Sequence, residues 1–268
     1  MMATPEPPEA SEPSEFGPSG EAQKVSILGT PISPTSYAEV LRGLDAPAGD
    51  RGRVLAFCNV HSVMTARKDP RVRRALVDAD IATPDGMPLV WVLRRRGFPQ
   101  QPRVYGPDLM ELALAHGVPL GWRHFFLGAT DETLERLRAC AEDLAPGVQV
   151  VGALAPPYRP LTASEEDHIV ARIHSSGANL LWVGLGMPKQ ELWMHHIRTR
   201  LPGVSLLGVG AAFDLLSGTV PQAPDWIQDH GLEWAYRLWR RYLFNNPAFA
   251  LMATLETMRH GAKSSSRG

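Results

Sequence analysis

The stretch Gly184-Leu185-Gly186-Met187-Pro188-Lys189-Gln190-Glu191-Leu192-Trp193 joins an apolar run, Asn179 to Val183, to the start of a helix. Two glycines and a proline make this junction. Gly184 and Gly186 let the backbone approach a ligand closely, and Pro188 suits a first helical position, where no N–H is needed. The pattern therefore predicts a buried strand that turns directly into a helix, which is the basic unit of an α/β fold.

The same turn is a candidate anion site. The N–H groups of a first helical turn point at whatever lies in front of it, and Lys189 and Gln190 add a charge and an amide. The third glycine of the dinucleotide fingerprint is missing. The spacing alone leaves two interpretations open, a phosphate-binding turn and an ordinary strand-to-helix turn.

Length and composition exclude several classes of protein. With 268 residues, 44% of them hydrophobic, the chain can bury a large core as one α/β domain or as a domain with an appendage. A net charge of −1 argues against a general nucleic-acid binder. Two cysteines, Cys58 and Cys140, are too few for a disulfide framework or a cysteine-based zinc site, and they suit a reducing cytosol.

The chain ends are expected to be tails. Residues 1–23 are rich in Pro, Glu and Ser and contain neither a basic residue nor an apolar run, which predicts a disordered tail rather than a signal peptide. Residues 263–268 are expected to form a second, flexible tail. No run of about 18 apolar residues occurs, so no membrane span is predicted.

Between the tails, short apolar runs alternate with helical patterns. Residues 130–144 carry apolar side chains at helical spacing, and Thr162-Ala163-Ser164-Glu165 is a capping-box pattern ahead of a second helix. This alternation predicts an α/β fold over residues 24–220, with a Rossmann-like parallel sheet flanked by helices and ligands at the carboxyl ends of the strands. The runs that predict strands buried on both faces are Val25 to Leu28, Val54 to Phe57, Ile81 to Thr83, Arg123 to Leu127, Val148 to Gly152, Leu180 to Val183 and Val204 to Val209.

After Val220 the strand pattern stops, and residues 221–262 are predicted to form a C-terminal helical appendage. Six aromatic residues between Trp226 and Phe244 are interleaved with Arg237 and two further arginines. Such a helix either lies among lipid headgroups or packs on its own domain or on a second copy of the chain, as in a homo-oligomer. The sequence leaves these alternatives open.

A second constellation is Ala82-Thr83-Pro84-Asp85-Gly86-Met87-Pro88, where a predicted strand ends in an acidic residue. Asp85 can act as a general base toward a hydroxyl, or it can cap the helix that begins near Met87. Arg103 precedes another proline-initiated helix and suits either a diphosphate clamp or a surface ion pair.

Two further patterns have alternatives. The turn from Gly208 through Gly210 to Asp214 is either a second phosphate turn, with Asp214 on a ribose or sugar hydroxyl, or a site of tight packing. Asp78-Ala79-Asp80 matches a metal-holding pattern, but it links a helix to a strand and is interpreted as a solvated surface. His195 and His196 point in different directions on a helix and make a poor ligand pair. No metal site is predicted.

Together these motifs resemble the WecG/TagA/CpsF glycosyltransferase family over about Val25 to Pro247. The matching blocks are Asn59 with Ala66-Arg67-Lys68-Asp69-Pro70, Pro84-Asp85-Gly86, Arg103-Val104-x-Gly106-x-Asp108-Leu109-Met110, Val183-Gly184-Leu185-Gly186-x-Pro188-Lys189-Gln190-Glu191-x-Trp193, Gly208-Val209-Gly210-x-x-Phe213-Asp214, Gly218-x-Val220, Ala223-Pro224-x-Trp226, Gly231-Leu232-Glu233-Trp234-x-Tyr236-Arg237-Leu238 and Arg241-Tyr242-Leu243-x-x-Asn246-Pro247.

The resemblance implies a bacterial inverting enzyme that needs neither metal nor cofactor. Its donor would be a UDP-sugar, of the ManNAc or mannosyl type, with a GDP-sugar as the other option. Its acceptor would be a polyprenyl-diphosphate-linked saccharide in surface polysaccharide or teichoic-acid-type synthesis. The enzyme would be cytoplasmic and peripheral, on the inner face of the plasma membrane, and part of the appendage 221–262 would close over its active site. A non-catalytic nucleotide-sugar-binding module at the membrane remains the alternative.

The resemblance also implies roles for single residues. Asp85 would be the base, Arg103 would neutralise the departing diphosphate, and Asn59 would orient acceptor or sugar. The implied substrate-binding residues are Gly184, Gly186, Pro188, Lys189, Gln190, Gly210, Asp214 and Arg237. One departure stands out: the family often has Thr-x-Asn where this chain has Phe57-Cys58-Asn59, so a hydroxyl contact to the substrate is missing.

Overall fold

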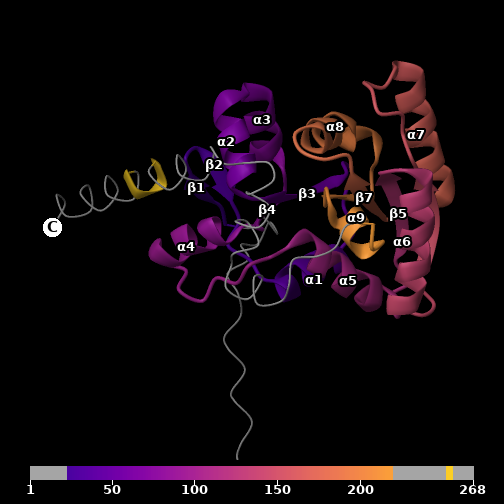
Figure 1. Ribbon diagram of the computed structural model, residues 1–268, viewed down its shortest axis with the longest axis horizontal. Coiled ribbons are helices and arrows are strands. Elements are labelled where there is room, and N and C mark those ends of the chain that lie inside the picture. The colour runs from indigo at the N-terminus through magenta and orange to yellow at the C-terminus, as the bar shows by residue number, and fades with distance from the viewer. Residues whose placement is uncertain (1–22, 220–251, 256–268) are drawn as a thin grey trace, which may run out of the picture.

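A computed structural model describes residues 23–219 and 252–255 of the chain. Its centre is a six-stranded parallel sheet with the strand order β4-β3-β8-β7-β5-β6 (Figure 1). The predicted α/β fold is confirmed, because six of the seven predicted strands lie in this sheet. Their bounds are β3 Arg53–Cys58, β4 Ile81–Pro84, β5 Arg123–Gly128, β6 Gln149–Leu154, β7 Leu180–Gly184 and β8 Ser205–Gly208.

Helices cover both faces of the sheet. One buried cluster joins the sheet to α2, α3, α4, α7 and α8, and a second joins it to α1, α5, α6 and α9. In Figure 1, α2, α3 and α8 lie above the sheet and α1 and α5 below it. The bounds on the first face are α2 Val60–Lys68, α3 Pro70–Asp78, α4 Met87–Arg95, α7 Ala163–Ser176 and α8 Lys189–Ile197. Those on the second are α1 Tyr37–Asp45, α5 Gly106–Gly117, α6 Asp131–Leu144 and α9 Ala212–Leu216.

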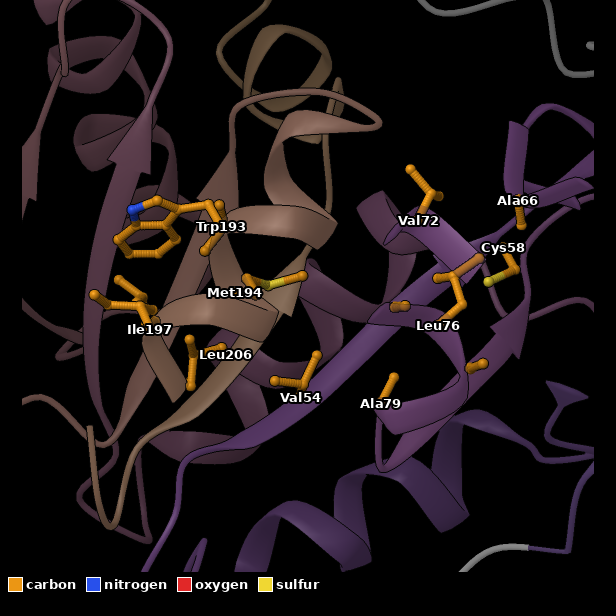
Figure 2. Packing of buried hydrophobic residues seen from close by; sticks show 14 of the residues in the cluster. Val54, Cys58, Ala66, Val72, Leu76, Ala79, Trp193, Met194, Ile197 and Leu206 are labelled. Atoms are coloured by element: carbon orange, nitrogen blue, oxygen red, sulfur yellow. The ribbon is translucent and has the colours of Figure 1, made fainter. Parts of the chain in front are cut away.

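The strands are apolar on both faces, as the continuous runs predict. In β7, Leu181 and Val183 pack with the first cluster, whereas Leu180 and Trp182 pack with the second, because successive side chains of a strand point to opposite faces. Figure 2 shows the first cluster, with side chains of α8 facing Val54 and Leu206 of the sheet.

The first predicted strand forms, but outside the parallel sheet. β1 (Val25–Ile27) pairs antiparallel with β2 (Thr30–Ile32) in a separate two-stranded sheet. The residues between them, Leu28 and Gly29, have φ values of 50° and 81°. Positive φ at both positions is the geometry of a tight hairpin, which returns the chain at once and leaves no room for a crossover helix.

The helix-start signals hold. Thr162 and Glu165 form the predicted capping box at the start of α7, and Thr130 caps α6. Pro188 is different: it is the N-cap residue, and α8 begins one position later, at Lys189.

Little of the predicted appendage is described. Residues 252–255 are helical, and Ala253 is buried in the cluster that also contains Ile27. The other appendage residues, Arg237 among them, and both predicted tails lie outside the described residues, except residue 23. Among the helices that the structure describes, none is long and apolar enough to cross a membrane.

Candidate active site

The candidate residues gather at one edge of the sheet. Because β3, β4, β7 and β8 are parallel, their carboxyl ends meet there, and we call this the carboxyl edge. Asn59 follows β3, Asp85 follows β4, the turn to Lys189 follows β7, and Gly210 follows β8. The chain runs from β3 to its neighbour β4 on one side and then crosses to β5 on the other. Ligands of open α/β sheets bind at such a change of direction.

Asp85 and Arg103 meet at the carboxyl edge. The Asp85 N–H donates to the Cys58 carbonyl at 2.8 Å, which fixes Asp85 against the end of β3. Arg103 Nε donates to the Asp85 carbonyl at 2.5 Å, and Arg103 Nη2 lies 3.8 Å from Asp85 Oδ1. The two side chains are only 23% and 15% exposed, so their charges are partly shielded from water. A carboxylate and a guanidinium are therefore presented together.

The carboxylate of Asp85 does not cap the helix that follows it. The N-cap of α4 is Gly86, and no side chain caps that helix. The helix-cap interpretation at Met87 is therefore wrong. Asp85 Oδ2 instead accepts from the N–H of Gly106, the first residue of α5, at 3.4 Å. The carboxylate thus faces the positive end of a helix that begins 21 residues later in the chain.

A tyrosine network, which the sequence did not reveal, holds the loop that carries Arg103. Tyr37 Oη, on α1, donates to Asp108 Oδ2 at 2.9 Å and accepts from the Tyr105 N–H at 3.0 Å. Burial, reinforced by the charge of Asp108, raises the pKa of Tyr37, so its hydroxyl remains a donor at neutral pH. The Arg103 guanidinium carbon lies 3.9 Å from the centre of the Tyr105 ring. The only sequence signal for this network is Asp108, in the block that follows Arg103.

Asn59 lies next to the Asp85–Gly86 turn. A Cβ on Gly86 would lie 3.1 Å from Cβ of Asn59, so a larger residue there would require Asn59 to shift slightly. Asn59 is the N-cap of α2, and its Oδ1 accepts from the Ser62 N–H at 3.2 Å. Asn59 is exposed, and its Nδ2 makes no hydrogen bond to any residue that the structure describes. This amide group can donate to a ligand.

The two residues that depart from the family's Thr-x-Asn triplet, Phe57 and Cys58, are both buried. Phe57 is buried on the α5 face, 3.5 Å from the position that a Cβ on Gly106 would take. Cys58 is fully buried on the opposite face, where burial, with the nearby charges of Glu191 and Asp85, raises the pKa of its thiol. Neither side chain supplies a hydroxyl at the carboxyl edge.

Glycine is needed for different reasons at the two positions of the β7–α8 turn. A Cβ on Gly184 would lie 2.7 Å from the Phe213 ring, which indicates that tight packing requires this glycine. Gly186 has a φ of 74°, and nothing lies within 4 Å of its Cβ position. The positive φ favours glycine at this position, and its contact with a ligand stays a prediction.

The Gln190 side chain links the β7–α8 turn to the end of β8. Its Oε1 accepts from the Gly186 N–H at 3.1 Å, and its Nε2 donates to the Gly208 carbonyl at 2.7 Å and to Glu191 Oε1 at 2.9 Å. Both amide hydrogens are thereby used, and the side chain is buried. Gln190 joins the ends of β7 and β8, while its contact with a nucleotide-sugar stays a prediction.

Glu191 is a buried carboxyl that the sequence did not single out. It is 4% exposed, and its Oε2 has no hydrogen-bond partner among the described residues. Burial raises the pKa of Glu191 to about 7, against an opposing effect of the Gln190 hydrogen bond. Acidic residues are common in the first turn of a helix, where they interact favourably with the helix dipole. The sequence pattern therefore did not predict that Glu191 is buried.

The other predicted ligand residues follow the ends of β7 and β8. Gly210, with a φ of 56°, leads from β8 into α9, whose first turn holds Asp214. Burial raises the pKa of the Asp214 carboxyl. Lys189 is exposed, and its ammonium lies 4.4 Å from the centre of the Tyr158 ring.

The Asp78-Ala79-Asp80 pattern has a structural role. Asp80 Oδ2 accepts from the Val54 N–H at 2.7 Å and from the buried guanidinium of Arg198, so interpreting Asp80 as merely solvated was wrong. His195 and His196 point in different directions, as predicted, toward Asp78 and Glu166 respectively. Within the described residues, no group of three or more His, Cys, Asp or Glu side chains is placed to hold a metal ion.

In open α/β sheets, charged groups at the switch point mark the place where ligands bind, so the fold and the site define a ligand-binding α/β protein. Comparison with known families specifies the class further. The model of the glycosyl transferase WecG/TagA/CpsF family matches residues 25–263. The chain therefore belongs to this family of glycosyltransferases.

Proposed function

We propose that the chain transfers a sugar from a UDP-sugar to a polyprenyl-diphosphate-linked saccharide, with inversion at the anomeric carbon. The observation that carries this proposal is the meeting of Asp85 and Arg103 at the carboxyl edge, 3.8 Å apart and largely shielded from water. Family membership supports the donor and acceptor classes. The pathway is a bacterial surface polysaccharide or a teichoic-acid-type polymer.

In the proposed reaction, the acceptor hydroxyl attacks the anomeric carbon while Asp85 takes its proton. The new glycosidic C–O bond forms as the bond from that carbon to the diphosphate oxygen breaks, and UDP leaves with the electron pair. A single displacement from the face opposite the leaving group inverts the configuration. Asn59 Nδ2, which the described residues leave without a hydrogen bond, orients a sugar hydroxyl.

The charge that builds on departing UDP needs a positive partner. Arg103 supplies a fixed guanidinium, since Asp85 and Tyr105 both hold it, and Lys189 adds an ammonium at the start of α8. Fixed cations and helix N-termini stabilise such charge most strongly where water is excluded. The proposal therefore includes no metal ion and no cofactor.

Asp85→Asn tests the proposed base. The amide cannot take the proton, so turnover should fall by about 10²- to 10⁴-fold while UDP affinity changes little. Asp167→Asn is the matched control, because Asp167 is 67% exposed on α7 and pairs only with Arg200 among the described residues. Near-normal turnover of Asp85→Asn would refute the assignment. UDP binding by a wild-type chain that transfers sugar to no acceptor would instead favour the binding-module alternative.

The proposal places the enzyme on the inner face of the plasma membrane, where a polyprenyl-linked acceptor is found. Residues 221–262 would hold it there, since their aromatic side chains and arginines suit an anionic headgroup layer. Arg237, within this segment, would contact the substrate. A donor with GDP in place of UDP, and assembly of copies of the chain, are variants of the same proposal.

A further inference from the structure

A stripe of exposed side chains runs along α4, away from the candidate base. The helix begins at Met87, two residues after Asp85, at the β4 end of the sheet (Figure 1). Trp91 precedes Arg94 and Arg95 by three and four residues, so the three side chains share one face of the helix. Trp91 is 43% exposed and both arginines are exposed, while the opposite face of α4 packs in the core. The stripe therefore starts beside Asp85 and is open to a ligand.

The stripe is strongly positive. Between Asp85 and Asp108 the sequence has four arginines and no acidic residue, in a chain whose net charge is −1. The Arg95 side chain makes no hydrogen bond or ion pair with any residue that the structure describes, and Arg94 uses only its Nε within that part of the chain. Two guanidinium groups thus lack a carboxylate partner among the described residues, and an anionic ligand would supply one.

Arg94 is held in place by a buried side chain. Its Nε donates to the carbonyl of Gln101, which is 5% exposed. The Gln101 side chain is fixed in turn by two hydrogen bonds to the backbone of Thr35, at 2.6 and 3.1 Å. Arg96 differs, because its guanidinium turns to the Ser26 carbonyl. A guanidinium anchored through Nε still presents its two terminal nitrogens, which suit the oxygens of a phosphate.

We propose that Arg94 and Arg95 bind the diphosphate of the polyprenyl-diphosphate-linked acceptor. Trp91 would lie against the saccharide that joins this diphosphate to the hydroxyl at Asp85. The groups along α4 follow one another as carboxylate, aromatic ring and cations, and the groups of such an acceptor follow as hydroxyl, saccharide and diphosphate. This assignment rests on the proposed function, which supplies an acceptor of this class.

The direction of α4 fits the proposed reaction. At about 1.5 Å per residue, Arg95 lies roughly 12 Å along the helix axis from Met87, and Trp91 lies midway. The turn after β7 lies on the other side of β3 from β4, and α4 follows β4. An acceptor on α4 and a donor at the β7–α8 turn would therefore approach Asp85 from opposite directions, as a single displacement requires.

Geranyl diphosphate tests the subsite, because it carries an isoprenoid diphosphate without a saccharide. Its affinity for the full-length chain is measured by calorimetry, with excess UDP present to fill the donor site. Arg95→Gln, which loses no partner among the described residues, should weaken binding by roughly 3- to 10-fold, and the double variant with Arg94→Gln by more. Arg172→Gln is the matched control, since Arg172 is exposed on α7 and its substitution should leave the affinity unchanged.

Trp91→Ala separates the saccharide contact from the diphosphate contact. It should leave the affinity for geranyl diphosphate unchanged, because this probe has no saccharide. In the transfer assay it should raise the KM for the lipid-linked acceptor and leave the donor KM unchanged, as Arg95→Gln should. A loss of geranyl diphosphate affinity in Trp91→Ala as large as that in Arg95→Gln would overturn the proposed order of groups along α4.

Other results would overturn the subsite as a whole. No binding of geranyl diphosphate to the wild type would do so, as would unchanged affinity in the double variant or an equal loss in Arg172→Gln. If the double variant loses binding to phosphatidylglycerol vesicles but keeps its affinity for geranyl diphosphate, α4 is a membrane-docking surface instead. Unchanged melting temperatures check that the variants fold. If the double variant transfers sugar with an unchanged acceptor KM, the subsite fails and the proposed function stands. If the wild type binds geranyl diphosphate through Arg95 but transfers no sugar, the proposed function fails and the diphosphate site stands.

Discussion

Glu191 should make the stability of the protein depend on pH in a way that one substitution removes. Its carboxyl is buried, and burial raises its pKa from the ordinary 4.5 to about 7. Between these two pKa values the native state holds a proton that the unfolded state has released. The free energy of unfolding therefore falls as pH rises across this window, and it is lowest once Glu191 is ionised in both states.

The size of the effect follows from the shift. About 2.5 pH units at roughly 1.4 kcal/mol each give about 3 kcal/mol lost between pH 4.5 and pH 7. Glu191→Gln cannot ionise. It keeps an oxygen that can accept from Gln190 Nε2, but it places an N–H₂ where Oε2 has no partner. That second change costs stability at every pH and leaves the pH-dependent difference intact.

The assay is urea unfolding of wild type and Glu191→Gln at intervals from pH 4.5 to 8. The difference in free energy of unfolding should move in favour of the variant by about 3 kcal/mol as pH rises, and it should level off roughly one pH unit above the native-state pKa. Glu132→Gln is the matched control, because Glu132 is exposed on α6 and its substitution should give no such trend. Parallel stability curves for wild type and Glu191→Gln would refute the raised pKa.

Three further predictions concern the reaction. Tyr37→Phe should lower kcat by about 10-fold with little change in donor KM, because the Tyr105 N–H and Asp108 lose their common partner and Arg103 is positioned less well; unchanged kcat would remove Tyr37 from the positioning network. Activity should survive EDTA, since the proposal meets the diphosphate with cations of the chain itself, and loss of activity that manganese or magnesium restores would contradict this. Liposomes with anionic lipid should retain the intact chain at low salt and release it at high salt, whereas a chain ending near Gly218 should stay in solution; equal binding of both would return the aromatic residues of 221–262 to a packing role.

The fold was predictable where signals are local. Apolar runs marked the strands of the sheet, and capping patterns marked helix starts, as at Thr162. The β1–β2 hairpin was missed because Leu28, a residue that rarely adopts positive φ, occupies its turn in place of a usual turn residue. A pattern of residue types cannot report such a conformation.

The candidate site was predictable only in its strand-end residues. Asp85 was placed correctly at the end of β4, yet the helix end that its carboxylate faces begins at Gly106, and nothing local specifies that pairing. Tyr37 is even farther away in the sequence: its hydroxyl accepts a hydrogen bond from the N–H of Tyr105, 68 residues later. Contacts of this kind depend on the order of strands in the sheet, which composition and periodicity do not encode.

The glycine-rich blocks lie where the sequence predicted them, but their glycines are needed for different structural reasons. A Cβ on Gly184 would meet the Phe213 ring at 2.7 Å, and a Cβ on Gly208 would meet Met194 at 2.5 Å, so both glycines allow α8 and α9 to pack closely on the sheet. Gly186 differs from these two, because its positive φ favours glycine and nothing lies within 4 Å of its Cβ position. Gly184 and Gly208 thus serve packing, and Gln190 links Gly208 to Gly186, whose contact with the substrate stays a proposal.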